Sequence, residues 1–132
     1  MRRLVALPLA LVAMLGGCAS ITYGPDSGWS RADDLSVYSA MTMYGGIARQ
    51  QSALCNNSDP DGVVQRWNDD FGARQQAVTS ALVARHGIGA VRDAAAEAEP
   101  TRRVPCPDVN VPHWRESYTR LLRLLEMRLG LA

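Results

Sequence analysis

Apolar side chains recur every three or four residues in three long stretches of the chain, which is the spacing of amphipathic helices. The first stretch predicts a helix over about 30–55, opened by Ser30 and Asp33 as a capping box. The face that we expect to be buried holds Val37, Tyr38, Met41, Tyr44, Gly45, Ala48, Ser52 and Cys55. The Gly45–Gly46 pair weakens the helix centre by about 1 kcal/mol per glycine, and it marks either the close approach of a neighbour or a kink.

The second stretch predicts a helix from Pro60 to about His86. Asp59 is suited to cap this helix, proline fits the first helical position, and Gly87 is suited to follow the last turn. The expected buried face consists of Val63, Val64, Trp67, Phe71, Val78, Ala81 and Leu82.

Arg74 lies inside the apolar face of this second helix. We expect its stem to pack on the core while its guanidinium group stays in solvent or pairs with Asp70, one turn earlier. The alternative is a clamp for a ligand carboxylate, in a pocket that Trp67 and Phe71 would help to line.

A short third helix is expected over 89–98, ended by Pro100. Residues 100–110 then include three prolines and predict an extended connector that carries Cys106. No segment shows the alternation of a strand, and no internal repeat is visible.

The last helix is expected to begin at Asn110 and Pro112, and Glu116 and Arg120 form a favourable pair one turn apart. Its expected core face consists of Trp114, Tyr118, Leu121, Leu122, Leu125 and Leu129. The sequence therefore predicts an all-α fold, a small bundle of three longer helices and one short helix.

The N-terminal segment has the pattern of an export signal. Arg2 and Arg3 precede a run of twelve residues, 4–15, that is apolar except for one proline and too short to span a bilayer. The run ends in Leu15-Gly16-Gly17-Cys18. This motif resembles the lipobox of bacterial lipoproteins, in which an aliphatic residue and two small residues precede an invariant cysteine.

The resemblance implies cleavage before Cys18, a diacylglycerol on its sulfur and an acyl chain on its new amine. Because Ala19 is not the aspartate that commonly retains such proteins at the inner membrane, it implies an outer-membrane anchor facing the periplasm. We therefore expect a signal peptide over 1–17, a short tether over 18–29 and a helical domain over 30–132. The alternative is an ordinary secretory signal cut after Ala19.

With Cys18 lipidated, Cys55 and Cys106 remain, and an even pair in an oxidising compartment favours a disulfide. A metal site and a catalytic thiol are the alternatives, although no C-x-x-C or H-x-x-H spacing is present. The bridge would close a loop of 51 residues. It would place the end of the first helix beside the start of the last, so that these two helices run antiparallel.

The chain has 132 residues, a formal net charge of +1 and 47% apolar residues, which suits one domain and gives no electrostatic footprint for nucleic acid. Every basic residue is arginine, so a P-loop lysine or a Schiff-base lysine is excluded. Neither His86 nor His113 has a sequence-near acid–nucleophile partner that would complete a catalytic set. The adjacent carboxylates of Asp33–Asp34 and Asp69–Asp70 point about 100° apart on a helix. We expect no enzymatic activity, no metal and no cofactor.

The first and last helices each carry a second apolar line, which either packs inside the bundle or binds a partner. These candidate partner-binding residues are Met43, Ile47, Leu54, Leu124, Met127 and Leu131.

The layout also resembles the type II secretion pilotins, small helical lipoproteins whose first helix ends in a cysteine and a polar turn. The matching residues here are Cys55-Asn56-Asn57-Ser58-Asp59-Pro60 and Cys106, while Trp67, Phe71, Gly45-Gly46 and the three prolines of the connector depart from the family.

The pilotin resemblance implies a docking or chaperone module that binds an amphipathic segment of an outer-membrane secretin in a helical groove. Two other hypotheses stand beside it. One is a structural or envelope-stress lipoprotein with no dedicated ligand. The other is a small-molecule or hydrolase-inhibitor binding module that uses the pocket at Arg74.

Overall fold

The computed structural model describes residues 28–56, 59–98, 106 and 110–132. Within these ranges the secondary structure is entirely helical, which confirms the all-α prediction. The elements are η1 (Trp29–Arg31), α1 (Asp34–Cys55), α2 (Pro60–Trp67), η2 (Asn68–Gly72), α3 (Ala73–His86), α4 (Ile88–Glu97) and α5 (Val111–Arg128).

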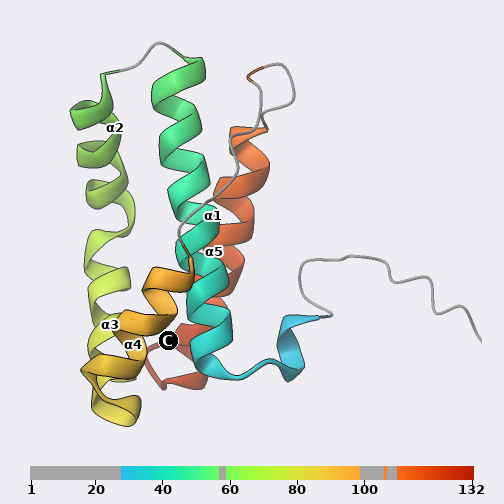
Figure 1. The fold of residues 1–132 in the computed structure, drawn as a ribbon, viewed down its shortest axis with the longest axis vertical. Helices are drawn as coiled ribbons and strands as arrows, with labels where there is room; N and C mark the ends of the chain where they lie inside the picture. The colour runs from blue at the N-terminus through green and yellow to red at the C-terminus, as the bar shows by residue number, and fades with distance from the viewer. Residues whose placement is uncertain (1–27, 57–58, 99–105, 107–109) are drawn as a thin grey trace, which may run out of the picture.

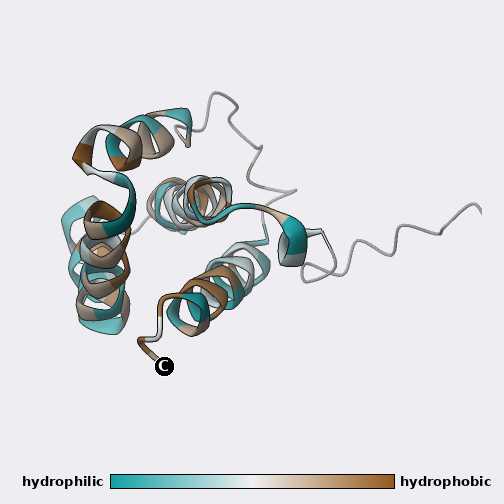
Figure 2. Ribbon diagram, turned by 90° about the horizontal axis from the view of Figure 1, so that it is seen from below, coloured by the Kyte–Doolittle hydropathy of each residue, from teal (hydrophilic) through white to brown (hydrophobic). Residues whose placement is uncertain are grey.

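Helix α1 is the centre of the bundle (Figure 1). Its most extensive contacts are with α5, which runs antiparallel to it as predicted, and it also packs against α4 and α2. Helices α2, η2 and α3 follow one another without a break, and we refer to them together as the α2–α3 arm. Seen along the helix axes, α1 lies among this arm, α4 and α5 (Figure 2). A central helix must bury more than one face, and this arrangement decides which apolar lines remain on the surface.

The predicted start of the first helix is wrong. Asp33, not Ser30, is the N-cap of α1, and its carboxylate accepts hydrogen bonds from the Ser36 amide (2.9 Å) and the Ser36 hydroxyl (2.8 Å). Ser30 instead lies in the 3₁₀ turn η1. A carboxylate that accepts two hydrogen bonds caps a helix better than the serine three residues earlier, so the helix begins at Asp34.

The second predicted helix has the expected ends but is divided inside. Asp59 accepts a hydrogen bond from the Gly62 amide (3.0 Å), and Gly87 follows α3 with a φ of +86°. Between α2 and α3, η2 forms a π-helical turn. Trp67 and Phe71, four residues apart at this turn, are both buried in the core.

The core follows the predicted faces with a few corrections. Val64 is exposed, Ala81 and Trp114 are half-buried at its edge, and Tyr44, Ser52 and Cys55 are only half-buried. On α1 three residues outside the predicted face are buried as well, namely Ala40, Ile47 and Gln51. The buried residues shared with the prediction are Val37, Tyr38, Met41, Gly45, Ala48, Val63, Trp67, Phe71, Val78, Leu82, Tyr118, Leu121, Leu122, Leu125 and Leu129.

Gly45 allows the close approach that its position suggested. A Cβ atom there would lie 2.9 Å from Cδ2 of Tyr118 and 3.2 Å from Cζ2 of Trp67. The rings of Trp67, Phe71 and Tyr118 form a cluster with centroids 4.7–4.9 Å apart. The missing side chain therefore lets α1 approach an aromatic cluster contributed by the α2–α3 arm and α5.

The third and last helices match the prediction closely. α4 begins at Ile88, and α5 is capped by Asn110, whose side chain accepts a hydrogen bond from the His113 amide (3.1 Å). The pair of Glu116 and Arg120 is present on α5. The signal peptide (1–17), all of the tether except Gly28 and Trp29, and all of the connector except Cys106 and Asn110 lie outside the described residues.

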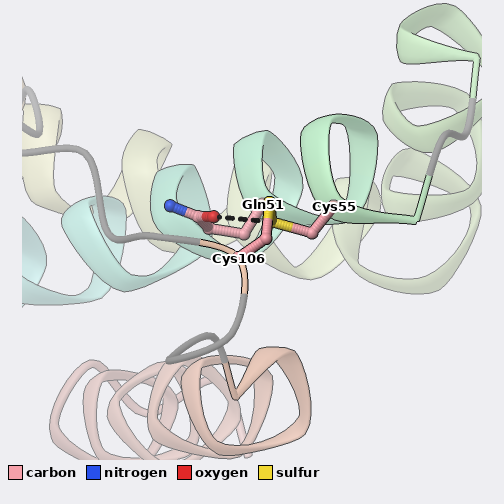
Figure 3. The surroundings of a disulfide bond; sticks show 3 residues. All are labelled: Gln51, Cys55 and Cys106. Carbon is pink, nitrogen blue, oxygen red and sulfur yellow. Dashed lines mark hydrogen bonds between the residues drawn. A yellow bond between two sulfur atoms is a disulfide. The ribbon is translucent and has the colours of Figure 1, made fainter.

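A disulfide between Cys55 and Cys106 joins the end of α1 to the connector ahead of α5, with the two Cα atoms 5.3 Å apart. Figure 3 shows that Gln51, one turn before Cys55, points at this bond. The Oε1 atom of Gln51 lies 3.2 Å from Cys55 Sγ. The predicted covalent link is therefore present at the end of the bundle where α1 finishes and α5 begins.

Candidate functional site

The six candidate partner-binding residues do not form one surface. Ile47 is 9% exposed, because α1 is the central helix and packs against several others, so Ile47 is not part of a binding surface. Met43 is half-buried, in a shallow hollow between α1 and the end of α4 that Trp29 and Ala98 also line. Leu54 is exposed near the disulfide end of the bundle. Only the three residues near the end of α5 remain close in sequence.

A hollow of about 660 Å³ runs along the outer side of α5 from Glu116 to Met127 and reaches Ser30 of η1. Leu124 packs partly against the core at its floor, and Met127 is 59% exposed. Leu131 is also exposed but does not line this hollow. We refer to this surface as the α5 hollow.

Polar side chains border the α5 hollow on the same helix. Arg120 and Glu116 form an ion pair, and Arg123 is exposed next to them. A strip of Leu124 and Met127 flanked by guanidinium groups suits contact with an apolar surface that carries acidic residues at its edge. The described lining contains no histidine and no thiol, and its two hydroxyl groups belong to Ser30 and Thr119.

Arg74 does not form the predicted site. Its guanidinium group donates two hydrogen bonds of 2.7 Å to Glu126 on α5, so the predicted pairing with Asp70 is wrong. Asp70 instead accepts a hydrogen bond from Arg115 (2.7 Å). Trp67 and Phe71 are buried in the core, so the three residues line no pocket for a ligand carboxylate.

In the Arg74–Glu126 pair, each residue stabilises the charged form of the other. The two hydrogen bonds from Arg74 lower the pKa of the Glu126 carboxyl, and the same bonds raise the pKa of Arg74. Burial raises the pKa of the Tyr118 hydroxyl to about 12, and this hydroxyl donates a hydrogen bond of 2.7 Å to Gln75. These groups hold α3 against α5 and present no reactive atom to solvent.

The histidines and carboxylate pairs occupy structural positions. His86 ends α3 and His113 lies in the first turn of α5, where its ring contacts Trp114 with centroids 5.3 Å apart. Asp33 caps α1, and Asp69 accepts a hydrogen bond from Gln65 (2.9 Å). Across the described ranges, no three metal-binding side chains come together.

Arg128, at the end of α5, holds the start of the domain and was not identified from the sequence. Its guanidinium group donates hydrogen bonds to the carbonyl oxygens of Trp29 (2.9 Å), Ser30 (2.9 Å) and Ala32 (2.8 Å). It also forms an ion pair with Asp34 (3.2 Å). Because these partners are 94 to 99 residues away in sequence, no local pattern could have indicated the contact.

None of the described helices is long and apolar enough to cross a membrane. Comparison with known proteins gives no match: no family model, no curated protein and no solved structure is significantly similar to this chain.

Proposed function

We propose that this protein is a lipid-anchored helical docking module of the outer membrane, with no enzymatic activity, that binds an amphipathic helix of a partner protein. The lipobox ending at Cys18 supports the anchor. The α5 hollow carries the proposal of binding, since it combines an apolar strip with a polar border on an exposed helix face.

The proposed ligand is a helix with one apolar face. That face would cover Leu124 and Met127, and acidic side chains at its edge would reach Arg123. The layout shared with pilotins makes the C-terminal segment of an outer-membrane secretin the first ligand to test. Helix-in-groove contacts of this kind derive most of their affinity from a few buried apolar anchors.

The test is a titration of the purified domain with a synthetic peptide of the secretin C-terminus from the same genome. We expect saturable binding that Met127→Glu weakens at least tenfold, because a carboxylate would be buried under the peptide. Leu54→Glu is the matched control, an exposed apolar residue elsewhere in the fold, and should leave the affinity unchanged. No binding by the wild-type domain, or equal losses in both variants, would reject the docking function.

The anchor has its own test. Intact-mass measurement of the protein purified from membranes should show cleavage before Cys18 and the added mass of the acyl chains. A mature chain that begins with an unmodified Ser20 would reject the anchor and leave the peptide titration to be judged separately.

A second candidate is a structural lipoprotein of the envelope with no dedicated ligand. The observation that favours it is the division of the exposed apolar residues among separate places, Leu54 near one end of the bundle and Ile88 near the other. Under this function the peptide would not bind, while the acyl chains would still be present.

A further inference from the structure

The polypeptide that links Cys18 to the domain enters at one defined end of the bundle. Gly28 precedes η1, and η1 is held in place by the hydrogen bonds from Arg128 at the end of α5. Arg85 at the end of α3 adds an ion pair with Asp34 (3.8 Å) and a hydrogen bond to the Arg128 carbonyl (3.4 Å). The start of α1, the end of α5 and the α3–α4 corner therefore meet at this end, at the bottom of Figure 1.

This entry end also exposes two large apolar side chains. Ile88, the first residue of α4 after the turn at Gly87, is 62% exposed, and Leu131, just beyond α5, is 45% exposed. Figure 2, which views the bundle from below, shows apolar ribbon at the start of α4 and after α5. Arg31 and His86 are exposed at the same end. Exposed apolar side chains beside an arginine suit a surface that lies in the headgroup region of a bilayer.

The opposite end exposes a comparable apolar pair. Leu54, in the last turn of α1, is 56% exposed and Val64 on α2 is 46% exposed. The exposure of apolar side chains therefore does not show which end of the bundle contacts a membrane. The point at which the tether joins the domain does distinguish the two ends.

The length of the tether, compared with the length of the bundle, favours the entry end. Gly28 lies ten positions after Cys18, and a fully extended chain of that length spans at most about 35 Å. Helix α1 has 22 residues, and a helix of that length is about 33 Å long. The far end could reach the bilayer only if the tether ran fully extended along the bundle. The entry end can reach the bilayer in almost any conformation of the tether, so its effective concentration at the lipid surface is high.

We propose that the entry end, through Ile88 and Leu131, docks on the lipid surface and holds the bundle upright, with the disulfide end directed away from the membrane. The inference rests on the proposed acyl anchor at Cys18. The anchor supplies the attachment, and the two side chains supply the orientation, since a contact too weak to bind a free protein becomes significant once the protein is tethered. The α5 hollow would then lie on the side of an upright bundle, open to a partner in the same membrane.

The experiment uses the full acylated protein in vesicles of phosphatidylethanolamine and phosphatidylglycerol, followed by hydrogen–deuterium exchange with mass spectrometry. The reference is the same protein in detergent-free solution after replacement of Cys18 by serine in a secreted form. We expect exchange in segments 85–90 and 128–132 to be at least threefold slower on vesicles, and exchange in segments 52–56 and 60–66 to be unchanged.

Two double variants sharpen this test. Ile88→Ser with Leu131→Ser should abolish the protection at the entry end, whereas Leu54→Ser with Val64→Ser, matched in exposure, should retain it. Protection at the far end, or acylated protein with no protection at either end, would overturn the docking. An intact mass without acyl chains would remove the anchor and the inference with it, so the two failures are distinguishable.

Discussion

Arg74 and Glu126 are 52 residues apart in sequence, and two parallel hydrogen bonds of 2.7 Å join them across the packed helices α3 and α5. Glu126 is the more buried partner, and Arg74 keeps part of its side chain in solvent. A planar guanidinium group matches a carboxylate in this two-bonded geometry, which fixes the position of one helix against the other.

Glu126→Gln should therefore lower the free energy of unfolding by about 1 kcal/mol, because it removes the charge and one of the two acceptors while keeping the shape. Urea unfolding followed by circular dichroism measures this loss. Glu116→Gln is the control, since Glu116 pairs with Arg120 in solvent on a single helix, where such pairs contribute only about 0.3–0.5 kcal/mol. Equal losses in the two variants would show that the Arg74–Glu126 contact contributes no more to stability than an exposed pair on one helix.

The same pair predicts a dependence of stability on pH. The hydrogen bonds from Arg74 lower the pKa of the Glu126 carboxyl below its ordinary 4.5 in the folded protein. A lowered pKa means that the folded state favours the ionised carboxylate, so the contribution of the pair is complete above about pH 4.5 and is lost as the pH falls. The stability difference between the wild type and Glu126→Gln should shrink between pH 5 and pH 3. A difference that stays constant over this range would contradict the assignment.

Gly45→Ala should destabilise the protein although alanine is the better helix former. The new methyl group would lie 2.9 Å from Cδ2 of Tyr118 and 3.2 Å from Cζ2 of Trp67, two rings that are packed in the core. Overpacking of this kind costs about 1–3 kcal/mol, more than the gain of about 1 kcal/mol in helix propensity.

Gly89→Ala provides the matched control for this substitution. Gly89 is also helical, and a Cβ atom there meets nothing within 4 Å, so alanine should leave stability unchanged or raise it by up to about 1 kcal/mol. Thermal unfolding of the two variants gives the comparison. If Gly45→Ala stabilised the protein as Gly89→Ala does, the approach of α1 to the aromatic cluster would not be tight.

Reduction of the disulfide should cost a large part of the stability. The bond between Cys55 and Cys106 closes a separation of 51 residues, for which loop entropy predicts about 4 kcal/mol. We expect the double variant Cys55→Ser with Cys106→Ser to melt well below the wild type. Dithiothreitol should lower the melting temperature of the wild type to that of the variant and leave the variant unchanged. Two free thiols in the denatured, unreduced protein would exclude the bridge.

The features that could be predicted from sequence are those with a local signal. Asp59, Asn110 and Gly87 mark helix ends through their own side chains or backbone conformation, and the spacing of apolar residues gave most of the core. The burial of Ile47 could not be predicted this way, because it depends on how many neighbours surround α1. A helical wheel identifies an apolar line but does not show whether another helix covers it.

For the candidate site, too, the features with a local sequence signal could be predicted and those that depend on tertiary packing could not. The apolar line of Leu124 and Met127 was visible in the sequence, and the structure places both residues along one hollow on α5. The partners of Arg74 and Arg128 depended on tertiary packing across 52 and up to 99 residues. Long-range pairs of this kind have no signature within a window of one or two helical turns.

Arg128→Lys should loosen the start of the domain although it preserves the charge. The guanidinium group of Arg128 donates to three carbonyl oxygens, those of Trp29, Ser30 and Ala32, and contacts Asp34. A lysine ammonium is a compact charge with three donors and cannot reproduce the planar arrangement that spans these acceptors. We expect a loss of about 1–2 kcal/mol in unfolding free energy and faster amide exchange over residues 29–36.

Arg123→Lys on the same helix is the control, because Arg123 is exposed and makes no comparable set of contacts among the described residues. It should change neither the unfolding free energy nor the exchange rates beyond error. In vesicles, Arg128→Lys should also reduce the protection of segment 85–90, because a loosened η1 no longer fixes the end of the bundle to which the tether is attached. Equal behaviour of the two variants in all three measurements would show that Arg128 does not position the tether.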